Sequence, residues 1–343
     1  MRALRTPGAA RPQLPVRLTN TRYPGRMLRA PVPQTIHVGE AVEDAIRKAD
    51  ALIEALPYIQ QFTGRPVVIK FGGNAMENAQ ILDDVLEDVV FLATVGIRAI
   101  IVHGGGPQIT LAMQQAGLSP RFVAGHRVTD GEALDVVVRV LADEVAAQIA
   151  QRIQAHGGKA RCAYTDGASL LTARKKTLEA RDGSGRVQMH DVGFVGEVIS
   201  VRTRELLDMA SDGTVAVVPP IGQDDAGQLY NINADTAAAA VAGATSAEKI
   251  VFLSNVHGVM SEPGNEDSLL STVHEDEIAS LIEQNIITGG MLPKVAACLD
   301  ALHAGVRKAH IVDGRLPHSL LLEIFTDRGV GTQILKRSGR EGA

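Results

Sequence analysis

Residues 67–73 read V-V-I-K-F-G-G, and this pattern of a strand followed by glycines decides the fold class. The apolar run predicts a buried strand, and the paired glycines allow a tight turn after it. Residues 100–107, I-I-V-H-G-G-G-P, repeat the pattern, and apolar residues at helical spacing follow over 81–94 and 107–116. Alternating strands and helices predict a mainly parallel sheet with helices on both faces. We therefore expect an α/β protein built as a three-layer αβα sandwich.

The same alternation continues toward the C-terminus. Apolar runs predict strands over 215–218, 249–253 and 309–312, and the strand at 309–312 is expected to be the last of the chain. Helices are predicted over 235–243, 278–284 and 295–304. Residues 180–200 differ, because glycines at 183 and 185 stand among alternating apolar residues. That pattern predicts a β-hairpin inserted in the sheet domain.

The N-terminal 39 residues have a composition of their own. They contain seven Arg, six Pro and no Asp or Glu, and they show no apolar period, so residues 1–39 are predicted to be a disordered tail. An Arg-rich, acid-poor start is also typical of an organelle transit peptide, although the prolines and the lack of Ser argue against one. Residues 40–64 differ, because apolar side chains at helical spacing predict a helical unit that Gly64-Arg65-Pro66 ends.

Bulk composition excludes several classes of function. The net charge is −5 and only 3% of residues are aromatic, which argues against binding of nucleic acid by charge or by base stacking. No run of about 20 apolar residues indicates a membrane span. Cys162 and Cys298 are too few for a Cys-rich zinc site and are expected to be buried thiols. The histidines lack metal-ligand spacing, so we predict no protein metal site, and His103 and His126 are expected to be surface or hydrogen-bonding residues.

Polar residues follow the predicted strands at the edge where open parallel sheets bind ligands. Lys70 ends the first strand before Gly72 and Gly73. It either faces an anion in a crevice or extends from the strand edge into water. Glycines 104–106 precede a helix start, where unpaired N–H groups favour a phosphate or carboxylate, and a tight turn is the alternative.

A second polar group lies in the C-terminal half. Residues 230–236, Y-N-I-N-A-D-T, place Asp235 before an Ala-rich helix, where it serves either in the crevice or as a helix cap. Lys294 follows two glycines and can reach the same crevice from a helix start. Two lysines, one aspartate, two glycine turns and Arg127 suit phosphoryl transfer, which depends on positioning and charge neutralisation more than on covalent chemistry. The sequence has neither a P-loop signature nor a dinucleotide-binding glycine fingerprint.

Seven motifs, in order, resemble the amino-acid kinase family. They read A-L-P-Y-I-Q-Q-F at 55–62, V-V-I-K-F-G-G-N-A-M at 67–76, V-H-G-G-G-P-Q-I at 102–109, R-V-T-D at 127–130, G-F-V-G-E-V at 193–198, N-I-N-A-D-T-A-A at 231–238 and I-I-T-G-G-M-L-P-K-V at 286–295. Within the family they are similar to the branch that uses ATP to phosphorylate the γ-carboxylate of N-acetyl-L-glutamate, the second step of arginine biosynthesis. The resemblance implies a kinase domain over 65–336, with a substrate-binding lobe to about 215 and an ATP-binding lobe from about 216.

The resemblance also implies roles for individual residues. Lys70 and Lys294 would stabilise the transition state, and Asp235 would hold both ammonium groups. Substrate would be bound by Gly72, Gly73, Gly105, Gly106, Arg127 and Asn231, with Arg127 on the α-carboxylate. ATP would be bound by Asn255, Val256, His257, Gly258, Val259, Met260, Gly290 and Met291, and its Mg²⁺ would be held mainly by phosphates and water. The family usually has Asp where this chain has Asn255, which bears on ATP affinity rather than on the reaction.

A regulatory layer is implied as well. Residues 309–332 resemble the C-terminal signature of arginine-inhibited members, and the helical unit with Tyr58 resembles the helix that interlaces dimers into a hexamer. The implied arginine site consists of Tyr58, His310, Glu323 and Gly329, and a merely packed helix over 320–325 is the alternative. Some arginine-sensitive members also bind a nitrogen-signalling PII protein, a partner that the sequence leaves open.

Two other functions compete with this interpretation. One is a sister kinase that acts on aspartate, glutamate, carbamate or UMP, against which R-V-T-D together with N-I-N-A-D favours the acetylated glutamate. The other is a catalytically silent arginine sensor, against which the intact lysine pair and Asp235 argue. A cytoplasmic location is expected, with a plastid as the alternative if residues 1–39 are a transit peptide.

Overall fold

The computed structural model describes residues 38–76, 78–123, 125–181, 187–262, 264–326 and 328–337. The helix predicted over 40–64 is confirmed as α1 (Val38–Phe62). The chain divides into two compact units between Ala49 and Asp50, inside α1, and everything described below lies in the second unit. Of the tail predicted to be disordered, residues 1–37 lie outside the described part, and residues 38 and 39 begin α1 instead.

An eight-stranded sheet forms the centre of this unit. Its order is β14 (Thr272–His274), β16 (Thr332–Leu335), β15 (Lys308–Asp313), β13 (Lys249–Ser254), β1 (Pro66–Phe71), β2 (Arg98–His103), β10 (Thr214–Val218) and β5 (Lys159–Cys162). Neighbouring strands are parallel except β15 and β16, which are antiparallel. The predicted mainly parallel sheet is therefore confirmed, and the carboxyl ends of β1, β2 and β13 meet at one edge.

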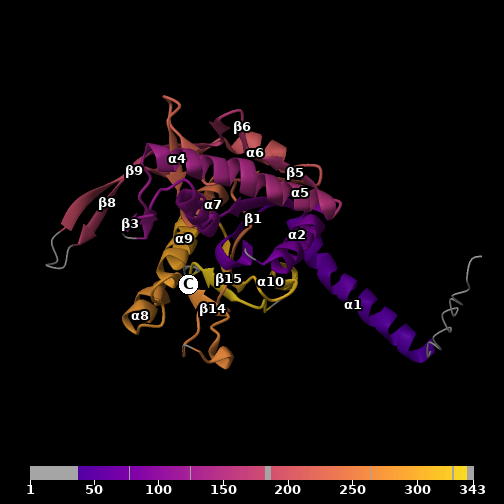
Figure 1. The fold of residues 1–343 in the computed structure, drawn as a ribbon. Helices are drawn as coiled ribbons and strands as arrows, with labels where there is room; N and C mark the ends of the chain where they lie inside the picture. Colours follow the sequence, from indigo (N-terminus) through magenta and orange to yellow (C-terminus); the bar gives the residue numbers. More distant parts are fainter. Residues whose placement is uncertain are drawn as a thin grey trace, which may run out of the picture. The chain divides into compact units, whose positions relative to one another are not determined.

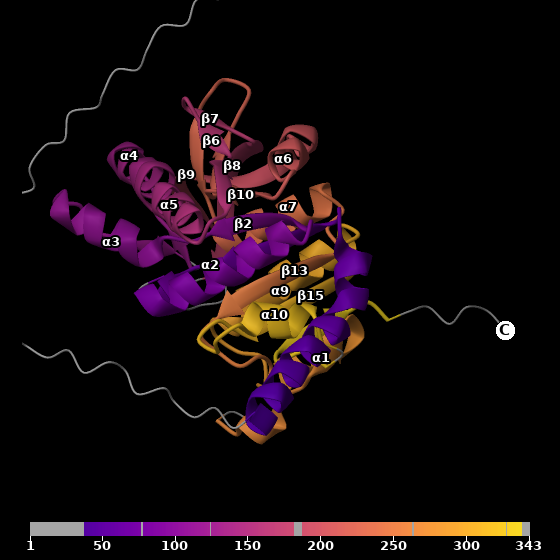
Figure 2. The same cartoon turned by 90° about the vertical axis from the view of Figure 1, so that its right-hand side faces the viewer.

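Helices cover both faces of the sheet, as Figure 1 shows. One apolar core joins Val67 and Ile69 to α2 (Ala79–Thr94), α3 (Gly106–Gln115), α4 (Gly131–Val138), a π-helical segment (Arg139–Ala146), α5 (Ala147–Ala155) and α10 (Ser319–Ile324). A second core joins Val68 to α6 (Thr203–Met209), α7 (Ala234–Ala244), α8 (Ile278–Glu283) and α9 (Met291–His303). Alternate residues of a strand point to opposite faces, so the apolar residues 67–69 of β1 supply both cores. Figure 2 views the face that α2 and α10 cover.

Smaller strands extend the fold beside this sheet. The hairpin predicted over 180–200 is confirmed as β8 (Leu171–Arg181) and β9 (Val187–Val201), which close a small barrel with β11 (Ile221–Gln223) and β12 (Leu229–Ile232). Two short ribbons are formed by β3 (Phe122–Val123) with β4 (His126–Arg127), and by β6 (Tyr164–Thr165) with β7 (Ala168–Ser169). Short 3₁₀ turns lie at η1 (Gly73–Met76), η3 (Glu266–Ser268) and η4 (Glu275–Glu277). The β3–β4 ribbon carries Arg127 toward the carboxyl edge of the sheet.

Three sequence predictions need correction. The strand predicted over 309–312 is β15, but it is not the last, because β16 follows at Thr332–Leu335. A four-residue strand carries too little periodicity to be distinguished from a loop. The last long helix begins at Met291 rather than at 295, and Cys162 is only half-buried, whereas Cys298 is buried as predicted. No helix of the described residues is long and apolar enough to span a bilayer.

Candidate active site

Two lysines share one aspartate where β1, α7 and α9 meet. Lys70 Nζ lies 2.6 Å from Asp235 Oδ1, and Lys294 Nζ lies 3.4 Å from Asp235 Oδ2. The exposed fraction is 10% for the side chains of Lys70 and Asp235 and 20% for that of Lys294. The structure thus brings together three residues that are 59 or more positions apart in sequence, and we call them the lysine–aspartate cluster.

Local sequence explains why Asp235 is available to the lysines. The helix α7 begins after Asn233, whose side chain accepts hydrogen bonds from the backbone N–H groups of Asp235 and Thr236 at 2.9 and 3.2 Å. Asn is among the preferred helix N-caps. Because Asn233 performs the capping, the carboxylate of Asp235 is free to face the two ammonium groups.

Burial and neighbouring charges both shift pKa values within the cluster. Burial lowers the pKa of Lys70, Asp235 opposes that change, and Lys294 adds to it. Burial would raise the pKa of Asp235, but the two lysines outweigh it and hold that pKa below its ordinary value. A carboxylate between two ammonium groups leaves a positive excess, and in a buried place such an excess attracts an anion strongly.

A cavity of about 270 Å³ adjoins Lys70 on the side of the glycine turns. It is lined by Gly73, Gly104, Gly105, Gly106, Pro107, Ile109, Phe122, Gly125, His126, Arg127, Leu141, Val195, Pro220, Asn231, Ile232, Asn233 and Ala234, as well as Lys70. The turns after β1 and β2 approach closely, since a Cβ on Gly72 would lie 3.0 Å from Gly104 Cα. That approach requires glycine, and it lets backbone N–H groups border the cavity.

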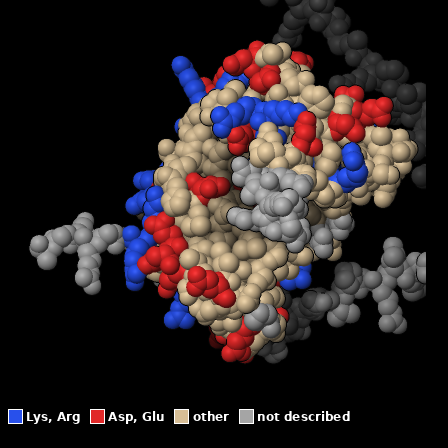
Figure 3. Space-filling model, turned by 90° about the vertical axis from the view of Figure 1, so that its left-hand side faces the viewer, with Lys and Arg blue, Asp and Glu red and all other residues tan. Residues whose placement is uncertain are grey.

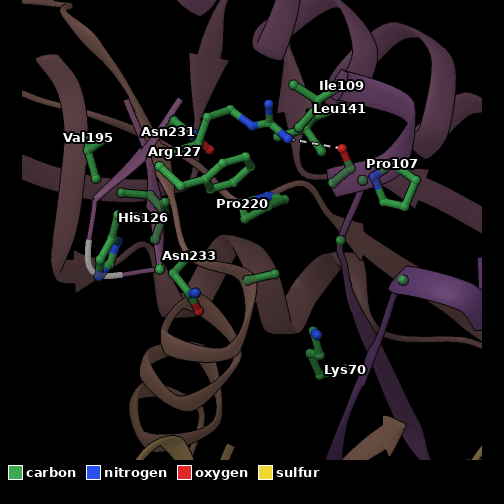
Figure 4. Close-up of a pocket in the computed structure, with 18 residues that line it drawn as sticks. Lys70, Pro107, Ile109, His126, Arg127, Leu141, Val195, Pro220, Asn231 and Asn233 are labelled. Atoms are coloured by element: carbon green, nitrogen blue, oxygen red, sulfur yellow. Dashed lines mark hydrogen bonds between the residues drawn. The ribbon is translucent and has the colours of Figure 1, made fainter. Parts of the chain in front are cut away.

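Arg127 is a buried cation in this cavity, and no acidic side chain of the described residues pairs with it. Its Nη2 donates to Gly106 O at 3.0 Å and to Thr110 Oγ1 at 2.7 Å, and its guanidinium lies 4.7 Å from the ring centre of Phe122. Burial lowers the pKa of Arg127, and no carboxylate of the described residues opposes that shift. Figure 4 shows Arg127 and Lys70 at opposite ends of the cavity. The arrangement suits a ligand with two separated anionic groups.

A second cavity, of about 440 Å³, lies on the other side of the cluster. Ser254, Asn255, Val256, Thr288, Gly290, Met291 and Lys294 line it. A smaller space of about 150 Å³ is lined by Lys70, Gly72, Gly73, Leu253, Ser254, Asn255 and Lys294. It shares Lys70 with the first cavity and Lys294 with the second. The lysine–aspartate cluster therefore stands at the junction of the two cavities.

The family model for the amino acid kinase family matches residues 65–313 of this chain. The chain belongs to the amino acid kinase family. Relatives agree with this family match. The acetylglutamate kinase of Heliobacterium modesticaldum is 45% identical over 293 residues, which cover 85% of this chain and 99% of the relative. The acetylglutamate kinase of Acinetobacter baumannii is 44% identical over 307 residues, 90% of this chain and 99% of the relative. The family predicted from the seven motifs is confirmed.

Solved structures agree on the amino acid kinase fold. The N-acetylglutamate synthase of Neisseria gonorrhoeae, complexed with coenzyme A and N-acetyl-glutamate, matches 85% of this chain with a TM-score of 0.71 and 27% identity. This chain spans 64% of that synthase. The carbamate kinase of Giardia lamblia bound to AMP-PNP matches 80% of this chain and 99% of its own, with a TM-score of 0.54 and 17% identity, and shows the fold alone.

The residues expected to bind ATP divide into two groups. Asn255, Val256, Gly290 and Met291 line the second cavity. The rest of the predicted loop, from His257 to Met260, is absent from its lining and packs away from it. His257 lies between Asp313 Oδ2 at 3.1 Å and Glu266 Oε1 at 3.2 Å, and Val259 N–H donates to Thr332 Oγ1 at 2.8 Å.

The residues expected to bind arginine are also divided. Tyr58 lines a third cavity, of about 120 Å³, with Gln61, Phe62, Glu248, Lys249, Lys308 and Thr326. His310 and Glu323 are buried and hydrogen-bonded to each other, with His310 Nδ1 2.6 Å from Glu323 Oε1. Gly329 lies against the Glu323 carboxylate, where an added Cβ would overlap it. The structure therefore brings three of the four residues together and places Tyr58 at the neighbouring cavity.

Sequence reasoning missed several residues of these sites. Lys249 lines the third cavity, and its Nζ lies 5.0 Å from the ring centre of Phe62; burial lowers its pKa to about 8. Thr110, which holds Arg127, was also missed. The available signals were a lysine at the start of an apolar run and a hydroxyl one helical turn after the glycines. No group of three or more His, Cys, Asp or Glu residues gathers as a metal site in the described ranges.

Proposed function

We propose that this chain phosphorylates the γ-carboxylate of N-acetyl-L-glutamate with ATP, giving N-acetyl-L-glutamyl 5-phosphate in the synthesis of arginine. The observation that carries the proposal is the position of the lysine–aspartate cluster between two cavities. One cavity offers Arg127 and Lys70 at opposite ends, and the other begins at the carboxyl end of β13. Relatives that carry the name acetylglutamate kinase support the choice of substrate.

The charge of the first cavity favours an acylated amino acid over a free one. Its described lining contains the cations Lys70 and Arg127 and no Asp or Glu. The α-ammonium of free glutamate would lie unpaired among these cations, whereas an N-acetyl group carries no charge there. Asn231, whose Nδ2 lies 3.2 Å from Thr129 Oγ1, offers an amide oxygen for the acetylated nitrogen.

The reaction would need no base from the protein. A side-chain carboxylate is ionised at neutral pH, so one of its oxygens attacks the γ-phosphorus of ATP. The bond from that phosphorus to the β–γ bridging oxygen breaks, its electron pair leaves with ADP, and an acyl phosphate remains. Lys70 and Lys294 would neutralise the charge on the transferred oxygens, and Asp235 would fix their positions. Mg²⁺ would enter with the nucleotide phosphates. This fits the described linings of the second cavity and of the smaller space, which contain no carboxylate.

An ADP-release assay tests this proposal. The full chain is given ATP and Mg²⁺ with N-acetyl-L-glutamate, L-glutamate or L-aspartate as the acceptor. We expect release that depends on the acetylated substrate, at rates typical of enzymes of this class. Equal or faster release with either free amino acid would replace the proposal by a sister activity, and no release with any acceptor would favour a silent sensor.

We further propose that L-arginine inhibits the chain at the third cavity. Lys249 and Lys308 line that cavity and can face the carboxylate of arginine, while Glu248, which also lines it, already pairs with Arg65 and Arg307. The buried Glu323 adjoins it, because Lys249 Nζ lies 3.4 Å from Glu323 O. Arginine would inhibit only if it bound an inactive arrangement more tightly than the active one. Adding arginine to the ADP-release assay tests this, and an unchanged rate at millimolar arginine would contradict it.

Assembly into a hexamer through α1 is also proposed. Leu52, Ile53 and Leu56 are 65%, 68% and 44% exposed, and apolar side chains so placed on a helix favour burial against another copy. Light scattering of the full chain and of Ile53→Glu tests it, with a fall in mass expected for the variant. A PII partner and the cytoplasmic or plastid location stay predictions.

A further inference from the structure

One short segment near the C-terminus contacts two separate parts of the molecule. The segment runs from Val330 to Thr332. On one side, Glu323 Oε2 accepts the backbone N–H of Val330 at 2.7 Å and of Gly331 at 3.0 Å. On the other side, Thr332 Oγ1 accepts the backbone N–H of Val259 at 2.8 Å. The segment therefore joins a buried carboxylate to the loop that follows β13.

The contact between Thr332 and that loop is close and buried. Thr332 is fully buried and Val259 is 2% exposed. Gly258 has a φ of +142°, and a Cβ built on it would lie 2.5 Å from Thr332 Oγ1 and 2.8 Å from Leu269 Cδ1. Because Gly258 has a positive φ and packs against the Thr332 hydroxyl, residue 258 must be a glycine for the loop to approach Thr332 this closely. The position of Thr332 thus sets the position of residues 258–259.

The same loop begins at the second cavity. Asn255 and Val256, three and two residues before Gly258, line that cavity with Lys294. A shift of the loop at Val259 would therefore move the cavity wall. The first cavity has none of these residues in its described lining, so such a shift would not act on Arg127 directly.

Glu323 holds the other side of the segment firmly. Burial would raise its pKa, but the hydrogen bonds from His310 and from the N–H groups of Val330 and Gly331 outweigh burial and lower it. Hydrogen bonds to an ionised acceptor are about twice as strong as those between neutral groups. The charged carboxylate thereby fixes the two residues that precede Thr332.

We propose that Thr332 and Glu323 are positioning residues for the nucleotide, acting in series through the loop at 255–260. Neither touches a reacting group. The inference rests on the proposed function in one respect, that the second cavity takes ATP. It adds that nucleotide affinity is set in part from the segment 330–332 and the carboxylate behind it.

Three variants of the full chain test this inference. Thr332→Val removes the hydroxyl and leaves the Val259 N–H buried without a partner, whereas Thr332→Ser keeps the hydroxyl and is the matched control. Glu323→Gln removes the charge behind the segment. The measurements are KM for ATP, KM for N-acetyl-L-glutamate, kcat, and the Kd of Mg-ADP by calorimetry. We expect Thr332→Val to raise KM for ATP and the Kd of ADP on the order of ten-fold. Thr332→Ser should stay within about two-fold.

The combined variant separates positioning from general damage. If the two residues act in series, Thr332→Val with Glu323→Gln should weaken ADP binding little more than the larger single change, because one contact path is removed twice. Additive losses, an equal rise in KM for N-acetyl-L-glutamate, or unchanged ADP binding would each overturn the inference. If Thr332→Val does not fold, Glu323→Gln is judged by the same split between the two KM values. Calorimetry needs no acceptor, so ADP binding still decides this inference if the proposed kinase activity fails.

Discussion

The lysine–aspartate cluster and Arg127 are both buried cationic sites, but only one of them contains its own anion. Asp235 lies within ion-pair distance of Lys70 and Lys294, whereas Arg127 is held by a carbonyl, a hydroxyl and an aromatic ring. A cation with an internal partner is fixed in place before any ligand arrives. A cation without one gains its partner when an anion binds. The first arrangement suits the positioning of a phosphoryl group during its transfer, and the second suits recognition of an anionic ligand.

The largest expected effect comes from removing the anion of the cluster. Asp235→Asn leaves one buried and one partly buried ammonium group without their counter-charge. We expect the unfolding free energy to fall by roughly 3–5 kcal/mol. Urea unfolding measures it. Asp83→Asn is the control, since the Asp83–Arg152 pair at 2.6 Å is 36% and 28% exposed and should lose at most about 1 kcal/mol. Similar losses of unfolding free energy in both variants would show that the lysine–aspartate cluster responds no differently from a partly exposed ion pair.

His103 provides a contrast with the two cationic sites, because its burial favours the neutral form of the side chain. His103 is fully buried at the end of β2, and burial lowers its pKa to about 4. Between about pH 6.5 and pH 4 the unfolded chain binds a proton that the folded chain does not, so stability falls as pH falls through this window. The loss should reach roughly 3 kcal/mol at pH 4. The difference in unfolding free energy between the wild type and His103→Gln, followed from pH 7 to pH 4, isolates it. A constant difference would contradict the assignment.

Arg127 should affect binding without affecting the fold. Arg127→Met strands no carboxylate, so the unfolding free energy should change little. KM for N-acetyl-L-glutamate should rise roughly ten-fold to a hundred-fold, because hydrogen bonds to a charged group contribute about 1.5–3 kcal/mol. Arg127→Lys keeps the charge but not the planar fork and should lie between the two. A large loss of stability in Arg127→Met with unchanged KM would show that Arg127 is structural.

Sequence alone predicted the parts of this molecule that local patterns determine. The strand 67–70 with its glycines and the helix start at Asp235 carry strong signals, and the family motifs placed Lys294 beside them. The sequence could not show that Asn233 rather than Asp235 caps α7, because both are good caps two positions apart. It could not show that Thr332 reaches Val259, because that contact spans 73 positions and depends on a four-residue strand. Arg127 was predicted as a substrate-binding residue, but only the structure shows that no acidic side chain of the described residues pairs with it.

Surface charge adds little to the comparison. On the face shown in Figure 3, acidic and basic side chains are scattered around a hollow near its middle rather than gathered by sign. This agrees with the modest net charge of −5. In the proposed function, attraction of an anionic substrate comes from the buried cations, where a lower effective dielectric strengthens each charge.

The turnover number of Lys70→Ala and Lys294→Ala, measured by ADP release with both substrates saturating, tests the account most directly. Each lysine is expected to stabilise charge that develops only during transfer, so kcat should fall roughly a hundred-fold to a thousand-fold in each variant. Circular dichroism checks that each variant is folded. Turnover close to that of the wild type in both folded variants would contradict the role given to the lysine–aspartate cluster.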